Sequence, residues 1–116
     1  MAGALVEVWQ CDAFGRYSGV RDLRAGFDSR GAKFLRGQQL SDADGAVRFV
    51  TIYPGWYPGR TVHIHFKVRT EPDAPFGREF TSQLYFHDRL TDRVHHRPPY
   101  AQRGPRSVTN REDGLF

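Results

Sequence analysis

The chain has 116 residues, and 17 Lys and Arg residues against 13 Asp and Glu residues give it a formal net charge of +4. This length fits one domain and leaves little room for a second. No apolar run approaches the roughly 18 residues that a membrane-spanning helix needs. Fifteen of the 17 basic residues are arginines spread among the acids from Arg16 to Arg111. The lack of a long apolar run argues against a membrane span. The lack of a basic run and of zinc-finger spacing argues against a nucleic-acid partner.

Five short segments, separated by turn-forming residues, have the composition and alternation of β-strands. They are residues 4–10, 34–40, 46–52, 61–68 and 80–86. Residues 20–33 show neither a 2-residue nor a 3.6-residue period, and we interpret them as a surface loop. The longest helix-compatible stretch, about residues 88–96, is short and poorly patterned. We expect the tail after it to be irregular. The pattern predicts an all-β fold, an antiparallel β-sandwich with irregular loops that carry the site.

The segment 61–68 carries the strongest candidate for a functional site, the pair His63 and His65. On a strand, side chains two residues apart point to the same side, so two imidazoles can converge on one ion. The opposite face of this strand is apolar, which makes the histidine face distinct. A bare His-x-His pair is also common as an exposed sheet-face feature, and that interpretation stays open at this point.

Tyrosines held by turn residues lie near this pair in the sequence. Tyr57 stands between two Pro-Gly turns, Arg60 follows it three positions later, and Tyr17 is framed by glycines. Two neutral imidazoles with one or two phenolates form an oxygen-rich set that suits Fe(III) better than zinc. A phenol has a pKa near ~10, so only a strong Lewis acid keeps it ionised at neutral pH.

Other polar residues are weaker candidates. Cys11 is the only cysteine, so no intrachain disulfide can form, and we expect a small buried side chain beside a strand. His95 and His96 are adjacent, and on an extended segment they would point to opposite sides, so we expect plain surface residues. Asp42 and Asp44 beside a glycine indicate a turn rather than a calcium loop.

Taken together, these motifs resemble those of intradiol ring-cleavage dioxygenases, the family of catechol and protocatechuate dioxygenases. The resemblance is carried by the segments VEVWQCDAFGRYSG, FLRGQQLSDADGAVRFVTIYPGWYPGRTVHIHFKV, TSQLYFHD and PPY. It implies a non-haem Fe(III) enzyme that opens catechol-type diols with O2 to cis,cis-muconate-type diacids. By the same resemblance, the metal ligands are Tyr17, Tyr57, His63 and His65. Arg60 and Gln83 match an arginine and a glutamine beside the substrate, and Tyr57 would also act in catalysis by leaving the metal when substrate binds.

The resemblance carries further expectations about the whole chain. Residues 1–116 would form a single catalytic core that lacks flanking strands of the family, so we expect it to pair with a second chain as a homodimer. Some relatives, including actinobacterial ones, are secreted, so the resemblance points to secretion, while the sequence itself shows no signal peptide and leaves the localisation open. In some secreted relatives a second cysteine lies near the position of Cys11, and no such partner is present here.

Two other classes of protein fit part of the pattern. A transthyretin-like β-sandwich binding module would carry the histidine pair as a structural or incidental metal site. A cupin also uses His-x-His, but it needs a further glutamate and a distant histidine, and no glutamate follows His65 at a useful spacing. Colour separates these classes, because tyrosinate bound to Fe(III) absorbs visible light and the alternatives are colourless.

Overall fold

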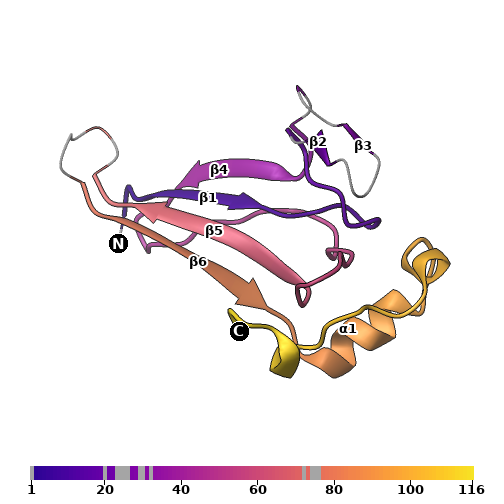
Figure 1. Ribbon diagram of the computed structural model, residues 1–116. Coiled ribbons are helices and arrows are strands. Elements are labelled where there is room, and N and C mark those ends of the chain that lie inside the picture. Colours follow the sequence, from indigo (N-terminus) through magenta and orange to yellow (C-terminus); the bar gives the residue numbers. More distant parts are fainter. Residues whose placement is uncertain are drawn as a thin grey trace.

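The fold consists of one main antiparallel sheet with a helix and a long tail at one end (Figure 1). The computed structural model describes residues 2–19, 21–22, 27–28, 31, 33–71, 73 and 77–116. Its elements in chain order are β1 (Leu5–Trp9), β2 (Arg21–Asp22), β3 (Phe27–Asp28), β4 (Arg36–Leu40), β5 (His63–Arg69), β6 (Glu79–Tyr85), α1 (Asp88–His95), and the 3-10 helices η1 (Tyr100–Arg103) and η2 (Asn110–Glu112).

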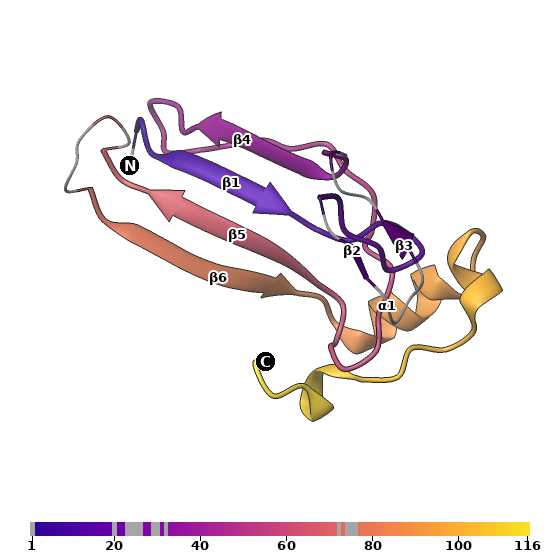
Figure 2. The same ribbon diagram turned by 45° about the horizontal axis from the view of Figure 1, so that its top comes forward.

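The main sheet has four strands in the order β4-β1-β5-β6, and each neighbouring pair is antiparallel (Figure 2). The expectation of an antiparallel all-β fold is confirmed. Four of the five predicted strands are present, over the segments predicted at 4–10, 34–40, 61–68 and 80–86. Within the segment 20–33, which we had interpreted as a loop, β2 and β3 pair with each other as two-residue strands. The remainder of that segment, apart from residues 31 and 33, lies outside the described residues.

The register of the main sheet places its functional side chains on one face. His65 of β5 lies opposite Trp9 of β1 and Gln83 of β6, and His63 lies opposite Tyr85. Side chains alternate along each strand, so these five residues share a face. The other face carries mostly apolar side chains from the three strands: Val6, Val8, Ile64, Phe66, Val68, Phe80 and Leu84.

The strand predicted over residues 46–52 is not formed. This segment runs beside the apolar face as extended chain without ladder bonds (Figure 1). Side chains of β4 and of the end of β1 attach it instead: Arg48 N donates to Gln39 Oε1 at 2.5 Å, and Gln10 Nε2 donates to the Ile52 carbonyl at 2.8 Å. Phe49 packs against Gly37, where no side chain stands in its way. The alternating pattern therefore indicates an amphipathic extended segment. Such a segment can form without backbone hydrogen bonds to a neighbouring strand.

The carboxyl-terminal third contains more helix than the sequence indicated. His87 caps α1 by accepting from Arg89 N at 3.2 Å, and the helix extends to His95. The tail that read as irregular contains η1 and η2. None of the helices in the described part of the chain is long and apolar enough to cross a membrane.

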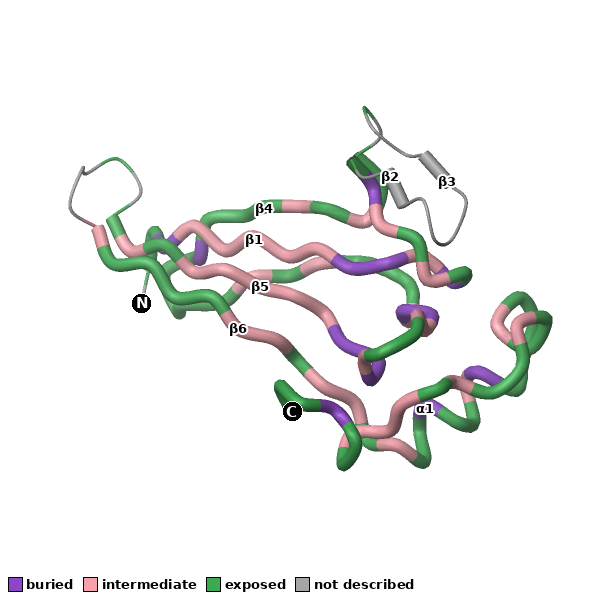
Figure 3. The backbone as a smooth tube through the Cα atoms, in the orientation of Figure 1, coloured by how far each residue is buried: buried purple, intermediate pink, exposed green. Residues whose placement is uncertain are grey.

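Burial is concentrated at the end of the sheet where β5 begins (Figure 3). Thr61, Val62 and His63 are nearly inaccessible to solvent. By contrast, Phe80 and Leu84 on the apolar side of β6 are 61% and 53% exposed. The segment that leads into β5 and carries the histidine pair is therefore among the most tightly packed parts of the described structure.

Candidate metal centre

The loop that carries Tyr17 is shaped by Asp12. Its Oδ1 accepts from the backbone N–H groups of Phe14 and Arg16, both at 2.9 Å, and its Oδ2 accepts from Arg16 Nε at 2.9 Å. Aspartate favours such turns because its short carboxylate reaches the backbone a few residues ahead. The result is a turn that reverses the direction of the chain after β1 and is followed by Tyr17.

Two glycines let this loop touch the loop that carries Tyr57. A β-carbon at Gly55 would collide with the backbone oxygens of Ala13 and Asp12, and one at Gly15 would collide with the Trp56 carbonyl. Gly15 also has a φ of +79°, which favours glycine. Gly55 N donates to the Asp12 carbonyl at 3.0 Å. This backbone-to-backbone contact brings the two tyrosine-bearing loops together.

The loop of residues 53–56 is held from its other side by α1 and η1. His95 is 7% exposed, its Nε2 lies 2.9 Å from the Pro54 carbonyl, and its ring stacks on Tyr100. The Tyr100 hydroxyl donates to the Tyr53 carbonyl at 2.6 Å. The interpretation of His95 as a surface residue is therefore wrong, because the helix turns it inward; His96 is exposed as expected.

Four side chains meet in the space between these loops and β5. Tyr17 Oη lies 3.2 Å from Tyr57 Oη, 3.3 Å from His63 Nε2 and 3.1 Å from His65 Nε2. His63 Nε2 lies 3.1 Å from Tyr57 Oη and 3.0 Å from His65 Nε2. All four residues that the sequence singled out as candidate ligands are thus brought together, with their donor atoms at one point.

Neighbouring groups fix both imidazoles. His63 Nδ1 lies 2.6 Å from the Thr61 carbonyl, which can only accept, so Nδ1 carries the proton and Nε2 presents a lone pair. The His65 ring lies parallel to the Trp9 indole, with centroids 5.1 Å apart. Trp9 had no role in the sequence analysis beyond its place on a strand, and only the register of β1 against β5 shows its function.

Burial sets the protonation states of the four groups. It lowers the pKa of His65 to about 4, with further lowering by His63 and Arg60, and it lowers the pKa of His63 as well. Burial raises the pKa of Tyr17 and of Tyr57. At neutral pH the imidazoles are therefore uncharged, and without a bound metal ion the phenols stay protonated.

Arg60 and Gln83 lie beside this cluster and contact each other. Arg60 Nη2 donates to Gln83 Oε1 at 2.5 Å. The Tyr85 hydroxyl lies 2.8 Å from the same Gln83 oxygen and 2.9 Å from the Leu115 carbonyl, and can donate to one of them at a time. Arg60 Nε donates to Asp113 Oδ2 at 2.8 Å. Neither Tyr85 nor Asp113 was a candidate from the sequence, where the tail shows no motif.

The donor set fits a hard metal ion. Ligands about 2 Å from an ion lie roughly 3 Å from one another, which is the spacing of the nitrogen and oxygen atoms of the two histidines and two tyrosines. Cys11 does not join them: it is 1% exposed, its Sγ lies 3.4 Å from the Gly55 carbonyl, and burial raises its pKa to about 12. It is the small buried side chain that the sequence predicted.

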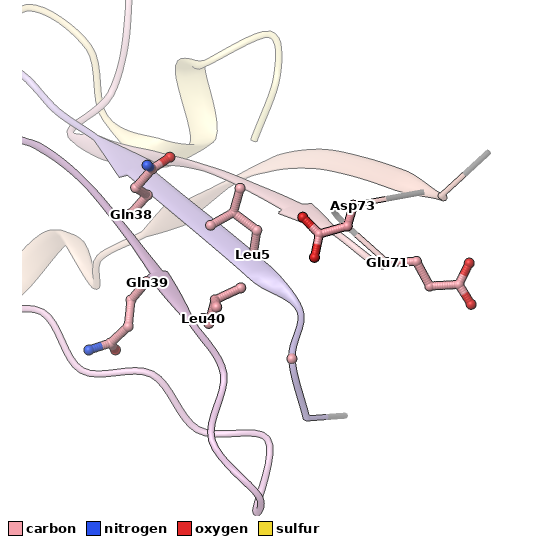
Figure 4. Close-up of a pocket in the computed structure, with 7 residues that line it drawn as sticks. Leu5, Gln38, Gln39, Leu40, Glu71 and Asp73 are labelled. Atoms are coloured by element: carbon pink, nitrogen blue, oxygen red, sulfur yellow. The ribbon is translucent and has the colours of Figure 1, made fainter. Parts of the chain in front are cut away.

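A separate hollow of about 880 Å³ lies at the opposite end of the sheet (Figure 4). Its lining includes Leu5 and Leu40 from the sheet and Glu71 and Asp73 from the turn after β5. The four converging side chains take no part in it. We therefore place the candidate site at the tyrosine–histidine cluster and not at this larger depression.

Comparison with known proteins decides the family. The family described as Dioxygenase matches residues 1–96. The chain is 41% identical over 91 residues to the protocatechuate 3,4-dioxygenase beta chain of Burkholderia cepacia, an alignment that covers 71% of this chain and 36% of the relative. It belongs to the intradiol ring-cleavage dioxygenases. A chlorocatechol 1,2-dioxygenase of Pseudomonas sp. (strain P51) is 30% identical over 103 residues, which cover 73% of this chain and 37% of that protein.

Solved structures of this family have the same fold. An intradiol ring-cleavage dioxygenase from Tetranychus urticae matches all of this chain with a TM-score of 0.82 and 35% identity, and the match covers 57% of that protein. The dioxygenase domain of a carbohydrate-binding fusion protein from Streptomyces sp. SirexAA-E matches 84% of this chain and 55% of its own, with a TM-score of 0.52 and 36% identity. The chain therefore spans about a third of the curated relatives and somewhat over half of the solved ones.

Proposed function

We propose that this intradiol dioxygenase chain binds Fe(III) through Tyr17, Tyr57, His63 and His65 and cleaves catechol-type diols with O2 between the two hydroxyl groups. The observation that carries the proposal is the convergence of four donor atoms, with 3.0–3.3 Å between the members of five of their six pairs. The reaction adds both oxygen atoms of O2 to the diol and gives a cis,cis-muconate-type diacid. The names of the relatives support an aromatic diol as substrate.

Iron(III), if bound by these residues, would supply a Lewis acid that makes the ring of the diol reactive towards O2. The chain's own residues do the rest. The neutral imidazoles of His63 and His65 would hold the ion, and Tyr57, once ionised by it, would accept a proton from the incoming diol. Arg60 keeps a fixed positive charge beside the cluster, and burial of its surroundings strengthens its attraction for the negative charge that develops on the ring.

The alternatives explain the geometry less well. In the described part of the chain, no group of three or more His, Cys, Asp or Glu side chains could hold a metal ion, so the carboxylate of a cupin-type site is missing. A binding module with an incidental histidine pair would not need two phenols aimed at the same point. His63 is also only 2% exposed, which is unlike a plain sheet-face histidine.

Product analysis tests the proposal. The purified protein is loaded with Fe(III), and O2 uptake is measured with catechol, protocatechuate and hydroxyquinol, with zinc-loaded protein as the control. We expect a red-brown protein, O2 uptake only with iron, and a diacid product by mass spectrometry and NMR. A yellow semialdehyde, which forms when the ring opens beside the diol, would refute intradiol cleavage. A colourless iron-loaded protein with no O2 uptake would favour the binding module.

A further inference from the structure

We propose that Asp113 is a positioning residue for the reaction, which holds the Arg60 guanidinium at the metal centre and so makes the tail segment 109–116 part of the active site. The inference rests on the proposed function of the site. Asp113 contacts none of the four converging side chains in the described structure, so it would act through Arg60. Arg60 and Asp113 are 53 positions apart in the sequence.

The Arg60 side chain is held from two sides. Its Nε donates to Asp113 Oδ2 at 2.8 Å, and its Nη2 donates to Gln83 Oε1 at 2.5 Å. Among the described residues, Arg60 forms its ion pair with Asp113. A long arginine side chain has many rotamers, and two bonds at different nitrogens select one of them and fix the plane of the guanidinium. Gln83 alone would leave rotation about that single bond.

Asp113 is itself rigidly placed. Its side chain has no solvent exposure, and both of its oxygens accept hydrogen bonds. Oδ2 accepts from Thr61 N at 2.7 Å in addition to Arg60, and Oδ1 accepts from Leu115 N at 2.7 Å. A buried carboxylate bound in this way cannot swing to another partner without losing bonds that water does not replace.

The tail brings Asp113 to the site in a defined geometry. Thr109 and Glu112 form a capping box around η2, with Thr109 N and Oγ1 donating to Glu112 Oε1 at 3.0 and 2.8 Å. Asn110 N donates to Asp88 Oδ1 at 3.1 Å, which fastens η2 to the start of α1. Asp113 follows directly as the residue that ends η2. The position of Arg60 therefore depends on the whole tail.

Two Asp→Asn variants give a matched test. Asp113→Asn removes the charge and keeps the size of the side chain. Asp44→Asn makes the same change at an exposed aspartate in the turn of residues 42–45, which belongs neither to the cluster nor to the tail. Folding is checked by circular dichroism. The exchange rate of the Arg60 Nε–H proton is then measured by NMR in metal-free protein, with Arg60→Lys used to assign the signal, and kcat and KM are measured in iron-loaded protein.

We expect Asp113→Asn to raise the Nε–H exchange rate of Arg60 at least about tenfold and to lower kcat by about tenfold to a hundredfold, with KM changed by less than about threefold. Asp44→Asn should match the wild type in both. In an Arg60→Ala background, Asp113→Asn should lower kcat by no more than about threefold further, because the two residues act as one unit.

Three results would overturn the inference: unchanged exchange of the Arg60 proton in Asp113→Asn, a loss of kcat equal to that of Asp44→Asn, or independent losses in the Arg60→Ala background. If the wild type consumed no O2 with any diol, the proposed function would fail. The exchange measurement on metal-free protein would still decide whether Asp113 positions Arg60, so the two failures can be told apart.

Discussion

The indole of Trp9 and the imidazole of His65 lie face to face, with an interplanar angle of 4°. They come from neighbouring strands and are directly opposite in register. A flat aromatic surface behind the imidazole prevents it from tilting, so that Nε2 points at His63 and Tyr17. The sheet thus supplies orientation as well as position to one side of the candidate metal centre, and the Arg36 guanidinium lies over the Trp9 ring, 5.7 Å from its centroid.

Removal of either histidine should abolish retention of iron. In His63→Ala and His65→Ala, one of four converging donors is lost and the remaining three leave an open, weak site. Iron content per protein, measured after gel filtration, should fall by at least about tenfold. His96→Ala is the control, because His96 is exposed and, among the described residues, its side chain bonds to the Asp92 carbonyl of its own helix. Full iron content in either site variant would contradict the ligand assignment.

The two tyrosines should differ in their effect on colour. Tyr17→Phe should alter the visible absorption of iron-loaded protein both alone and with a diol bound. Tyr57→Phe should alter it only without the diol, since we expect Tyr57 to leave when substrate binds. Tyr100→Phe, which removes a hydroxyl that bonds to the Tyr53 carbonyl, is the control and should leave the spectrum unchanged. Identical spectra for the two site variants under both conditions would refute the difference in roles.

Arg60→Ala should affect turnover more than binding. Its charge lies beside the cluster and interacts most strongly with negative charge that develops during the reaction. We expect kcat to fall by about a hundredfold and KM to change by a few-fold. Steady-state kinetics over a range of diol concentrations checks this. A rise in KM with unchanged kcat would mean that Arg60 serves substrate binding alone.

Stability in acid should depend on Asp113. Burial raises its pKa, but bonds from Arg60, Thr61 N and Leu115 N outweigh burial and lower the pKa from 3.8 to about 2. A carboxyl group with a lowered pKa stabilises the fold above its unfolded pKa, and this contribution is lost as the pH falls from about 4 to about 2. The shift corresponds to about 2 kcal/mol.

Urea unfolding of the wild type and of Asp113→Asn at several pH values measures this contribution. The difference in free energy of unfolding should be largest at pH 5 and above, and it should shrink by about 2 kcal/mol on going down to pH 2. A difference that stayed constant over this range would show that the carboxylate of Asp113 does not titrate with a lowered pKa.

Contact between the two tyrosine-bearing loops should require glycine at position 55. In Gly55→Ala the new methyl group meets the backbone of residues 12 and 13, and we expect a loss of about 1–3 kcal/mol of stability together with weaker iron binding. Gly114→Ala is the control, because no atom lies within 4 Å of the added carbon. Thermal unfolding and iron titration measure both effects. A Gly55→Ala variant with wild-type stability and iron affinity would show that the loops can separate without harm.

Much of the sheet and the cluster of four side chains could be predicted from local sequence. Strand alternation has a period of two, so His63 and His65 fall on one face wherever the strand lies. Pro-Gly pairs around Tyr57 mark a fixed turn. The motif as a whole carries the family resemblance, which the comparisons confirm. These features depend on residues close together in the chain.

What could not be predicted depends on contacts between distant residues. Alternation in residues 46–52 indicated a strand, but amide side chains from Gln10 and Gln39 bind this segment where a ladder would otherwise be needed. His95 is buried because α1 packs on the loop at Pro54, 41 positions earlier. Asp113 likewise depends on a tail without a motif. The local periodicity of the sequence does not indicate these contacts, because tertiary packing determines each of them.

The tail also limits how the protein can be handled at the bench. Phe116 packs edge-on against Tyr85, with ring centroids 5.1 Å apart, and the preceding carbonyl contacts the Tyr85 hydroxyl. An affinity tag inserted directly after Phe116 would begin beside Tyr85, whose hydroxyl contacts Gln83. A tag placed ahead of Gly3 would begin at the far end of the sheet (Figure 1), where Gly3 N bonds to the Ser41 carbonyl. Affinity tags therefore belong at that end. Comparison of the two fusions would measure how far an extension after Phe116 disturbs the site.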